Sequence, residues 1–291
     1  MNLIRFVVFA AVLNGILLAQ ISSSYIVTDD LNYEIEFTHP PERIITLAPN
    51  LTEMVYELGV ERHLVGNTLF CNYPEEAGEI EKVGDVLTFD YEKIISLSPD
   101  LVFITIEGNT RAAYEKFLGL GIKVFVSNPR DYNGIKKTFL DFGKIFDRSG
   151  IAEEIIVCWD SIVNEVKNSS QNNDPKTVMF LIEANPIMLA GENTFLNEFI
   201  SLCGLKNIAA ESPINYPVYS REEILIKNPD YIIYPTDGAH TISSIMDIYP
   251  EWNNLTAIKN DQVIFLNWDL FSRPGPRFVD ALKVLFNRLH L

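Results

Sequence analysis

Two stretches of the chain, EKIISLSPDLVFI (92–104) and EEILIKNPDYIIY (222–234), follow almost the same pattern. In each stretch a Glu begins a short helical run, a Pro-Asp pair ends the helix, and an apolar strand follows. The identical positions are Glu92/Glu222, Ile94/Ile224, Pro99/Pro229 and Asp100/Asp230. One explanation is chance, because a helix, a Pro-Asp turn and a strand often follow one another in α/β proteins. The other is that the chain contains two similarly built α/β lobes with a cleft between them.

Continuous apolar strands alternate with helical segments on both sides of these stretches. The strands are expected at 43–48, 101–106, 122–127, 177–183, 231–235 and 262–267. Strands that are apolar at every position, with helices between them, indicate a parallel sheet covered on both faces. We therefore predict an α/β protein of two lobes, each with a parallel-rich sheet flanked by helices.

Two local signals mark the start of the first lobe. Apolar and polar residues alternate over 25–37 around a turn, which predicts an antiparallel β-hairpin. Asn50, with Glu53 three places later, resembles a capping box at the start of a helix that Gly59 can end. The hairpin is therefore expected before the sheet, and this helix directly after its first strand.

The segment between the two lobes has a different pattern. Apolar residues recur at helical spacing through 133–168, with an interruption at Gly150. This pattern predicts one long helix, or two helices end to end, that joins the lobes as a stiff spine. The resulting division is a signal peptide at 1–24, an N-terminal lobe at 25–131, a linking helix at 132–170 and a C-terminal lobe at 171–291.

The composition of the chain excludes one class of partner. The length of 291 residues is sufficient for two lobes, each with its own core, and 47% hydrophobic residues with 21% charged residues is usual for a soluble globular protein. The net charge is −16 and no run of basic residues occurs. Nucleic-acid binding needs a basic surface that can neutralise phosphates, so we expect no nucleic-acid partner.

The first residues have the features of a secretory signal peptide. Arg5 supplies the positive start, residues 6–19 form an apolar core, and small residues follow at Ser22–Ser24. An uncleaved membrane anchor is the alternative, although the apolar run ends early for a membrane span. No Cys lies near the expected cleavage region, so a lipid anchor has no attachment point. We expect an exported protein of the periplasm that is not anchored to lipid.

Cysteine and histidine form no recognisable metal or catalytic motif. Cys71, Cys158 and Cys203 permit at most one internal disulfide, and the chain has no C-x-x-C. The histidines are dispersed, without H-x-H or H-E-x-x-H spacing. No G-x-S-x-G and no Gly-rich phosphate loop occurs. We therefore predict no metal site, no cofactor and no enzymatic activity.

The order of elements, together with several motifs, resembles the helix-linked class of periplasmic solute-binding proteins of ABC importers, which take up vitamin B12, ferric siderophores and haem. The motifs are PERIITLAPNLTEMVYELG (41–59), VGNTLFCNYP (65–74), IEKVGD (80–85), LSPDLV (97–102), LGIKVFV (120–126) and PVYSREEIL (217–225). Within the family, NYPVYSREEIL (215–225) and NWDLFSRPGPR (267–277) are most similar to the vitamin B12 binders. The resemblance covers roughly residues 25–291 and implies a ligand between the lobes and a permease that docks on both lobes at once.

The resemblance also implies which residues contact the ligand. Phe70 stands where vitamin B12 binders commonly place a Tyr against the corrin, and Tyr216 stands where they often have a Trp. A loop after the penultimate strand matches their ligand-touching loop. Its residues are Asp269, Leu270, Phe271, Ser272 and Arg273.

Two positions depart from the vitamin B12 binders. Val86 lies near the place of a Trp, so one aromatic wall of the cleft is missing, which leaves the choice between corrinoid, siderophore and haem open. Cys203 matches a cysteine that relatives bond to one in their last helix. Phe286 stands at that partner position, so this disulfide cannot form here.

The residue types suit a broad, flat ligand. A corrin or porphyrin is a mostly apolar plate with amide or carboxylate edges, and aromatic rings contact such a plate with little loss of conformational entropy. Phe70 and Phe271 follow directly on strands, where ligand-binding loops of α/β sheets lie. The alternative is that these rings, with Tyr216 and Trp268, belong to the cores of the lobes.

Arg273 precedes a rigid Pro-Gly-Pro turn. A fixed Arg at this place could bind a carboxylate or phosphate of the ligand, or it could pair with a nearby acid. Asp269 could orient Arg273, accept a hydrogen bond from a ligand amide, or cap a helix.

Glu92 and Glu222 occupy equivalent places in the two repeated stretches. By the resemblance, they would contact arginine clusters on a two-fold symmetric permease, one from each lobe. Charge pairs at the rim of an interface favour encounter and register more than affinity. The alternative is a purely local role, because the helix dipole favours Glu in the first turn.

These observations predict a periplasmic substrate-binding protein that captures vitamin B12 or a related corrinoid and delivers it to an ABC permease dimer with its ATPase. We expect a monomer, with cobalamin as the transported ligand and not as a cofactor. The alternatives are a ferric siderophore or haem binder of the same family, an exported enzyme that uses the interlobe cleft, and a receptor subunit that senses a ligand without transporting it.

Overall fold

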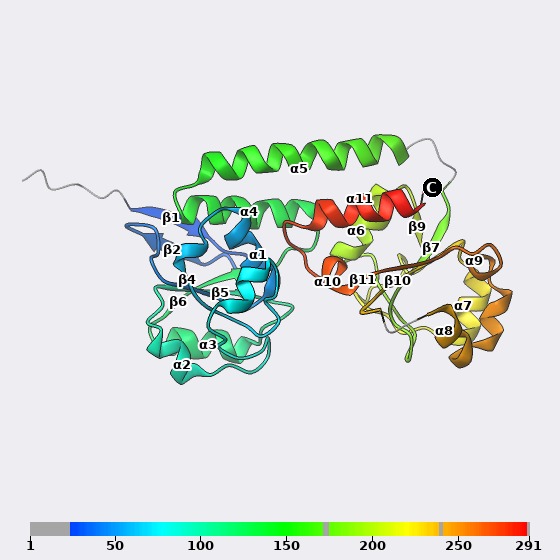
Figure 1. The fold of residues 1–291 in the computed structure, drawn as a ribbon, viewed down its shortest axis with the longest axis horizontal. Helices are drawn as coiled ribbons and strands as arrows, with labels where there is room; N and C mark the ends of the chain where they lie inside the picture. The colour runs from blue at the N-terminus through cyan, green and yellow to red at the C-terminus, as the bar shows by residue number, and fades with distance from the viewer. Residues whose placement is uncertain (1–23, 171–174, 239–240, 290–291) are drawn as a thin grey trace, which may run out of the picture.

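The computed structural model describes residues 24–170, 175–238 and 241–289, which form two lobes placed side by side (Figure 1). The predicted signal peptide, 1–24, lies outside the described residues except for Ser24. Over the ranges that are described, no helix combines the length and the apolar character needed to cross a membrane. The predicted fold class, two α/β lobes with parallel-rich sheets, is confirmed.

The N-terminal lobe contains a four-stranded parallel sheet in the order β4-β3-β5-β6. Its strands are β3 (Ile44–Thr46), β4 (Leu64–Asn67), β5 (Leu101–Thr105) and β6 (Lys123–Ser127). Every residue of β5 is buried, because helices cover both faces of the sheet. One face packs on α1 (Pro49–Glu57) and α4 (Tyr132–Ile145), and the other packs on α2 (Tyr91–Ser96) and α3 (Arg111–Gly119). The predicted hairpin is present as antiparallel strands β1 (Tyr25–Thr28) and β2 (Glu34–Phe37).

The C-terminal lobe repeats this plan with a five-stranded sheet. Its parallel strands are β7 (Thr177–Glu183), β9 (Lys206–Asn207), β10 (Tyr231–Thr236) and β11 (Val263–Asn267), and β8 (Met188–Leu189) is antiparallel to β7. One face packs on α6 (Phe195–Leu202) and α11 (Phe278–Leu289). The other packs on α7 (Arg221–Lys227), α8 (Ile242–Ile248) and α9 (Thr256–Lys259). The short helix α10 (Trp268–Phe271) follows β11 directly.

The sequence repeat corresponds to a structural repeat. Ile94 of α2 and Ile224 of α7 are both fully buried against the sheet of their own lobe. Both helices end at a residue with a left-handed backbone, Ser98 with φ 47° and Asn228 with φ 39°. The Pro-Asp pair then leads into β5 in one lobe and β10 in the other. The two lobes are therefore built alike at this connection, as the repeat predicted.

The prediction of one long helix, or of two helices end to end, is wrong. Residues 132–170 form α4 and α5 (Ser149–Ser170), which fold back on each other. The chain reverses at Asp147, whose φ of 54° cannot continue a helix. A Cβ on Gly143 would lie 2.7 Å from that of Ala152, so glycine permits the close approach of the two helices. The apolar stripes of the two helices therefore face each other, with the Phe139 and Trp159 ring centroids 4.7 Å apart.

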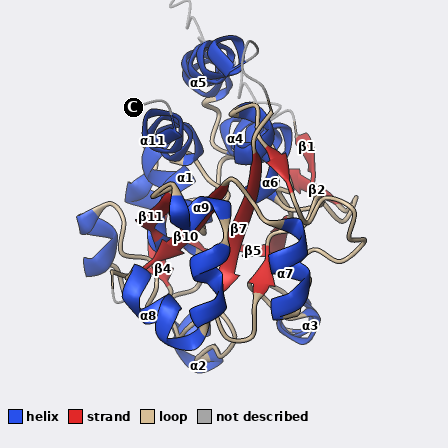
Figure 2. Cartoon of the chain, turned by 90° about the vertical axis from the view of Figure 1, so that its right-hand side faces the viewer, coloured by secondary structure: helices blue, strands red, loops and turns tan. Residues whose placement is uncertain are grey.

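Of these two helices, α5 is the one that runs across both lobes (Figure 1). It packs on α4 in the first lobe and on α6 and α11 in the second, and viewed along the long axis it lies outermost, above α4 and α11 (Figure 2). A single apolar core continues from the first lobe through α5 into the second. The stacked rings of Tyr132 and Phe278, 5.5 Å apart, join the lobes below it. This core braces the lobes on the side opposite the cleft.

Candidate functional site

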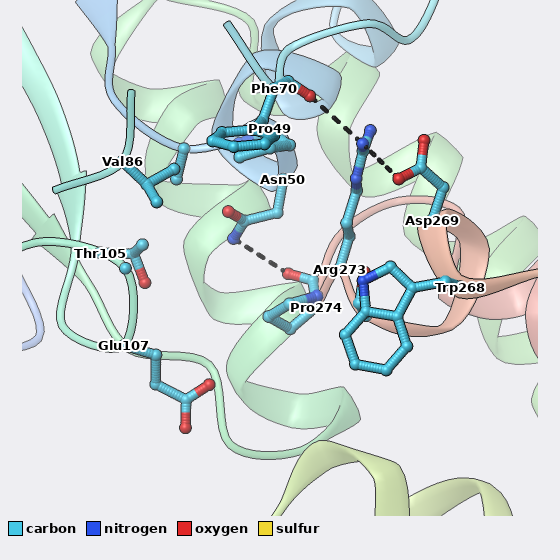
Figure 3. Close-up of a pocket in the computed structure, with 13 residues that line it drawn as sticks. Pro49, Asn50, Phe70, Val86, Thr105, Glu107, Trp268, Asp269, Arg273 and Pro274 are labelled. Atoms are coloured by element: carbon cyan, nitrogen blue, oxygen red, sulfur yellow. Dashed lines mark hydrogen bonds and ion pairs between the residues drawn. The ribbon is translucent and has the colours of Figure 1, made fainter. Parts of the chain in front are cut away.

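A cavity of about 330 Å³ lies between the lobes (Figure 3). On the N-terminal side it is bounded by the loops that follow β3, β4 and β5, and on the C-terminal side by the loop that follows β11. Loops at the carboxyl ends of parallel strands are where ligands of α/β sheets bind. The lining residues are Ala48, Pro49, Asn50, Phe70, Val86, Thr105, Glu107, Gly108, Trp268, Asp269, Ser272, Arg273 and Pro274.

Phe70 forms the wall of the first lobe. Its side chain is 54% exposed, which is unusual for a ring of this size and leaves one face open to the cavity. The loop beneath it is held by Lys82, whose ammonium donates to the Cys71 carbonyl at 3.2 Å and to Asn67 Oδ1 at 2.7 Å. Burial lowers the pKa of Lys82. Gly84 lies in the same region and has φ 126°. A Cβ there would lie 2.2 Å from the Thr88 carbonyl oxygen, so this position requires glycine.

Trp268 and Asp269 form the wall of the second lobe. Both lie in α10, which Asn267 caps by accepting a hydrogen bond from the Leu270 N–H at 2.9 Å. Trp268 is 39% exposed and lines this cavity as well as a neighbouring one of about 240 Å³. Phe70 and Trp268 thus offer one aromatic side chain from each lobe to whatever occupies the cleft.

Arg273 lies at the junction of the lobes and is only 8% exposed. Its Nη1 donates to Glu53 at 2.9 Å. Its Nη2 lies 2.9 Å from the Asp269 carboxylate and also donates to the Phe70 carbonyl at 3.2 Å and to Asn72 Oδ1 at 2.8 Å (Figure 3 shows the Phe70 and Asp269 contacts). Two of its partners are carboxylates, so its charge is balanced inside the protein.

Glu53 also binds Arg277. The guanidinium of Arg277 donates to the two carboxylate oxygens of Glu53 at 3.0 and 2.6 Å and lies 4.0 Å from the centre of the Tyr73 ring. Burial works to lower the pKa of Arg277, but the hydrogen bonds and charge of Glu53 outweigh it and raise the pKa. One carboxylate of the first lobe therefore holds two arginines of the second.

Two further cavities with acidic linings lie near the interlobe cavity. One, of about 440 Å³, contains Asp131, Glu192 and Glu198 together with Arg130, which forms an ion pair with Glu107 of the first cavity. The other, of about 240 Å³, contains Glu183 and Asp237 at the ends of β7 and β10, and its lining belongs to the second lobe alone. The pKa of Glu198 is raised, first by burial and then by the charge of Asp131. Carboxylates therefore outnumber arginines in the linings of these three cavities.

Four of the predicted ligand contacts line the interlobe cavity: Phe70, Asp269, Ser272 and Arg273. The prediction that Phe271 contacts the ligand is wrong, because Phe271 is 1% exposed and packs in the core with its ring centroid 5.2 Å from that of Phe199. The side chain that follows a strand need not face the cleft, and α10 turns this ring inward. Leu270 also packs against the core and lies outside the lining.

Tyr216 is half-buried near the junction and does not line any of these three cavities. Burial, strengthened by the charge of Glu107 and opposed by Arg130, raises the pKa of its phenol to about 12. These two charges belong to the first lobe, so Tyr216 faces the junction from the second.

Sequence reasoning missed Asn50, Glu53 and Asn72 as residues of the site. The capping box predicted for Asn50 and Glu53 is wrong, because α1 is preceded by Ala48 without a side-chain cap. Asn50 instead donates to the Pro274 carbonyl at 3.2 Å, and Gly275 packs directly against Asn50. The available signal in the sequence was a Glu inside an apolar run, since a carboxylate that is buried there needs a partner.

A larger cavity of about 600 Å³ lies on the flank of the first lobe, between the β1–β2 turn and α3. Leu31, Tyr33, Tyr114 and Leu118 are among its lining residues, and all belong to one lobe. It touches the interlobe cavity only at Thr105, which lines both. The interlobe cavity is the stronger candidate, because residues of both lobes form it.

Glu92 and Glu222 are both exposed, near the starts of α2 and α7. The two helices lie on the side of the lobes away from α5 (Figure 1). Ser220 and Glu223 form a true capping box at the start of α7, so Glu222 itself is free of that local role. Two acidic side chains are thus displayed at equivalent points of the two lobes.

Cys71, Cys158 and Cys203 are free thiols. Burial raises the pKa of Cys203 to about 12, so it is an unreactive core residue. Among the residues described, no group of three or more His, Cys, Asp or Glu side chains is placed to hold a metal ion.

Comparisons with known proteins identify the class. The family model described as periplasmic binding protein matches residues 44–270, so the chain belongs to the periplasmic binding protein family. The vitamin B12-binding protein of Vibrio cholerae is 30% identical over 245 residues, which cover 84% of this chain and 87% of that protein. That of Photorhabdus laumondii is 29% identical over 253 residues, which cover 86% of this chain and 88% of the relative. The resemblance inferred from the sequence motifs is thereby confirmed.

A solved structure of the same class has the same fold. The crystal structure of the periplasmic vitamin B12 binding protein of Vibrio cholerae superposes with a TM-score of 0.74 at 29% identity, covering 87% of this chain and 98% of that one. These relatives are binding proteins.

Proposed function

We propose that this protein captures vitamin B12 or a related corrinoid in the periplasm and delivers it to an ABC permease. The similarity to the vitamin B12-binding proteins of Vibrio cholerae and Photorhabdus laumondii supports this proposal. The observation that carries it is the interlobe cavity, in which Phe70 and Trp268 offer aromatic surface from opposite lobes. Such surfaces suit the faces of a broad apolar plate.

The charge of the cleft favours a corrinoid over haem, or over a ferric siderophore that has carboxylate groups. The linings of the interlobe cavity and its two neighbours contain seven carboxylates, Glu107, Asp131, Glu183, Glu192, Glu198, Asp237 and Asp269. Their two cations, Arg130 and Arg273, are both paired with carboxylates. A ligand with carboxylate edges would be repelled, whereas the amide edges of a corrin can donate hydrogen bonds to these acids.

Delivery would use Glu92 and Glu222. Their equivalent positions on α2 and α7 suit a permease dimer, which would offer the same cationic surface twice. We infer that the protein acts as a monomer, docks with one lobe on each permease subunit, and relies on the associated ATPase for transport.

Calorimetric titration of the purified mature protein with cyanocobalamin, a ferric hydroxamate siderophore and haem tests this function. We expect cyanocobalamin to bind most tightly. Tighter binding of haem or the siderophore would show that this ligand, and not a corrinoid, is the one the protein carries. Chemical turnover of any ligand would favour an exported enzyme. Deletion of the gene for this protein, in a strain that requires imported cobalamin, would separate transport from sensing. Loss of cobalamin-dependent growth would favour transport.

A further inference from the structure

Glu53 is a buried carboxylate whose strongest partners come from the other lobe. It is 3% exposed and lies in α1, directly behind the cleft. Its oxygens accept from Arg273 at 2.9 Å and from Arg277 at 2.6 and 3.0 Å. A buried charge is stable only when it is paired and hydrogen-bonded, and this one satisfies both conditions across the lobe junction.

The four charges of the ion-pair network that contains Glu53 sum to zero. Glu53 and Asp269 are negative, whereas Arg273 and Arg277 are positive, and three ion pairs connect all four. Arg273 is the member of the set that reaches the cavity lining together with Asp269. The cavity therefore meets an arginine that brings no net positive charge, and Nη2 of Arg273, which pairs with Asp269, also donates to the Phe70 carbonyl and to Asn72.

We propose that Glu53 determines which charge class of ligand the cleft accepts, by neutralising Arg273 and Arg277 from behind. With a neutral residue at position 53 the same cluster would carry one net positive charge beside the cavity. Ligands with carboxylate edges would then gain attraction, and uncharged amide-edged plates would gain little. This inference rests on the proposed function, because it assigns to a residue outside the cleft the preference for an uncharged corrinoid.

A purely structural role for Glu53 predicts a different result. The same carboxylate joins the two lobes, so its loss could weaken the binding of every ligand by loosening the cleft. A structural role therefore lowers affinity for all ligands alike. A role in charge selection moves the affinities for anionic and uncharged ligands apart.

The test is Glu53→Gln, which preserves the volume of the side chain and removes its charge. Binding of cyanocobalamin and of haemin is measured by calorimetry at pH 7.5 for the wild-type and variant proteins. One charge about 10 Å from a ligand carboxylate, at an effective dielectric constant of about 20, changes affinity by about tenfold. We expect the ratio of haemin to cyanocobalamin affinity to rise by about tenfold.

Two further variants separate charge from damage to the fold. Asp141→Asn is the matched control, because Asp141 is 5% exposed and paired with Lys137 and Lys144 but lines no interlobe cavity. It should leave the affinity ratio unchanged. The double variant Glu53→Gln, Arg277→Gln restores a net charge of zero and should return the ratio to the wild-type value.

An unchanged ratio in Glu53→Gln, with both affinities reduced or both retained, would overturn the proposal. So would a double variant that keeps the raised ratio. If Glu53→Gln does not fold, the Arg277→Gln variant tests the proposal. Its cluster has one net negative charge, so the ratio of haemin to cyanocobalamin affinity should fall by about tenfold. Failure of the proposed function has a separate signature, because the wild-type protein would then not bind cyanocobalamin at all.

Discussion

Asp100 and Asp230 make the same pair of contacts in the two lobes. Asp100 accepts from the Arg43 N–H at 2.9 Å and returns its own N–H to the Arg43 carbonyl at 2.8 Å. Asp230 accepts from the Thr177 N–H at 2.8 Å and returns its N–H to the Thr177 carbonyl at 3.0 Å. Each Asp thereby ties the start of one strand to the start of its neighbour, β3 to β5 and β7 to β10.

The first prediction concerns the stability of this connection. Asp230→Ala should lower the free energy of unfolding by about 1–3 kcal/mol, because it leaves the Thr177 N–H and hydroxyl without their acceptor in a partly buried place. Asp100→Ala should lower the free energy of unfolding by less, because Asp100 is exposed and water can replace its carboxylate. Urea denaturation measures both values. A larger loss in Asp100→Ala than in Asp230→Ala would contradict this account.

The second prediction concerns the aromatic wall of the cleft. Phe70→Ala should weaken cyanocobalamin binding by about tenfold or more, because truncation of an aromatic contact in an interface costs about 1–3 kcal/mol. Leu69→Ala is the matched control, since Leu69 is 64% exposed, adjacent in sequence and absent from the cavity lining. Equal cyanocobalamin affinities of the two variants would show that Phe70 does not contact the ligand.

The third prediction concerns docking. The double change Glu92→Ala, Glu222→Ala should leave cyanocobalamin affinity intact, because neither residue lines an interlobe cavity, and should slow uptake into vesicles that contain the permease. Glu153→Ala, Glu154→Ala removes two exposed acids from α5, on the opposite side, and should transport normally. Normal uptake by the first variant would exclude the docking role of these two glutamates.

The fourth prediction concerns pH. Burial is the main cause that raises the pKa of Tyr216 to about 12 from its usual value of 10.0. Below pH 10 the phenol is protonated in both states, so its contribution to stability is complete. Between pH 10 and about 12 only the unfolded chain ionises, so this contribution is lost as the pH rises. The loss at pH 11 should be about 1.4 kcal/mol.

The measurement is urea denaturation of the wild-type protein and Tyr216→Phe at pH 8.5 and pH 11. The phenylalanine variant cannot ionise, so it should become more stable relative to the wild-type protein by about 1.4 kcal/mol between these two pH values. An unchanged difference would show that the Tyr216 ring is accessible to water in the native state.

The elements of both lobes could be predicted because their signals are local. The strands predicted at 101–106 and 177–183 match β5 and β7, since apolar periodicity and turn residues act within a few positions of one another. The link between the lobes could not be predicted in the same way. Both α4 and α5 have the apolar stripe expected for a helix, and only their packing reveals that the stripes face each other.

The site was predicted in part. The family motifs placed Phe70, Asp269 and Arg273 in the cleft, and all three line the interlobe cavity. The direction of the Phe271 side chain followed from the turn of α10, and the motifs did not indicate it. Glu53 and Asn50 fitted a local capping pattern, although their partners lie in the other lobe.

The amino-acid sequence by itself determined the alternation of strands and helices, the duplicated connection at 92–104 and 222–234, and the family. These depend on which residues are apolar at which spacing, and that information is written along the chain. The tertiary structure alone decided that Glu53 meets Arg273, a residue 220 positions away, because that contact exists only once α5 has set the two lobes against each other. Electrostatic pairing depends on distances in space, and distances across a lobe junction are fixed by packing.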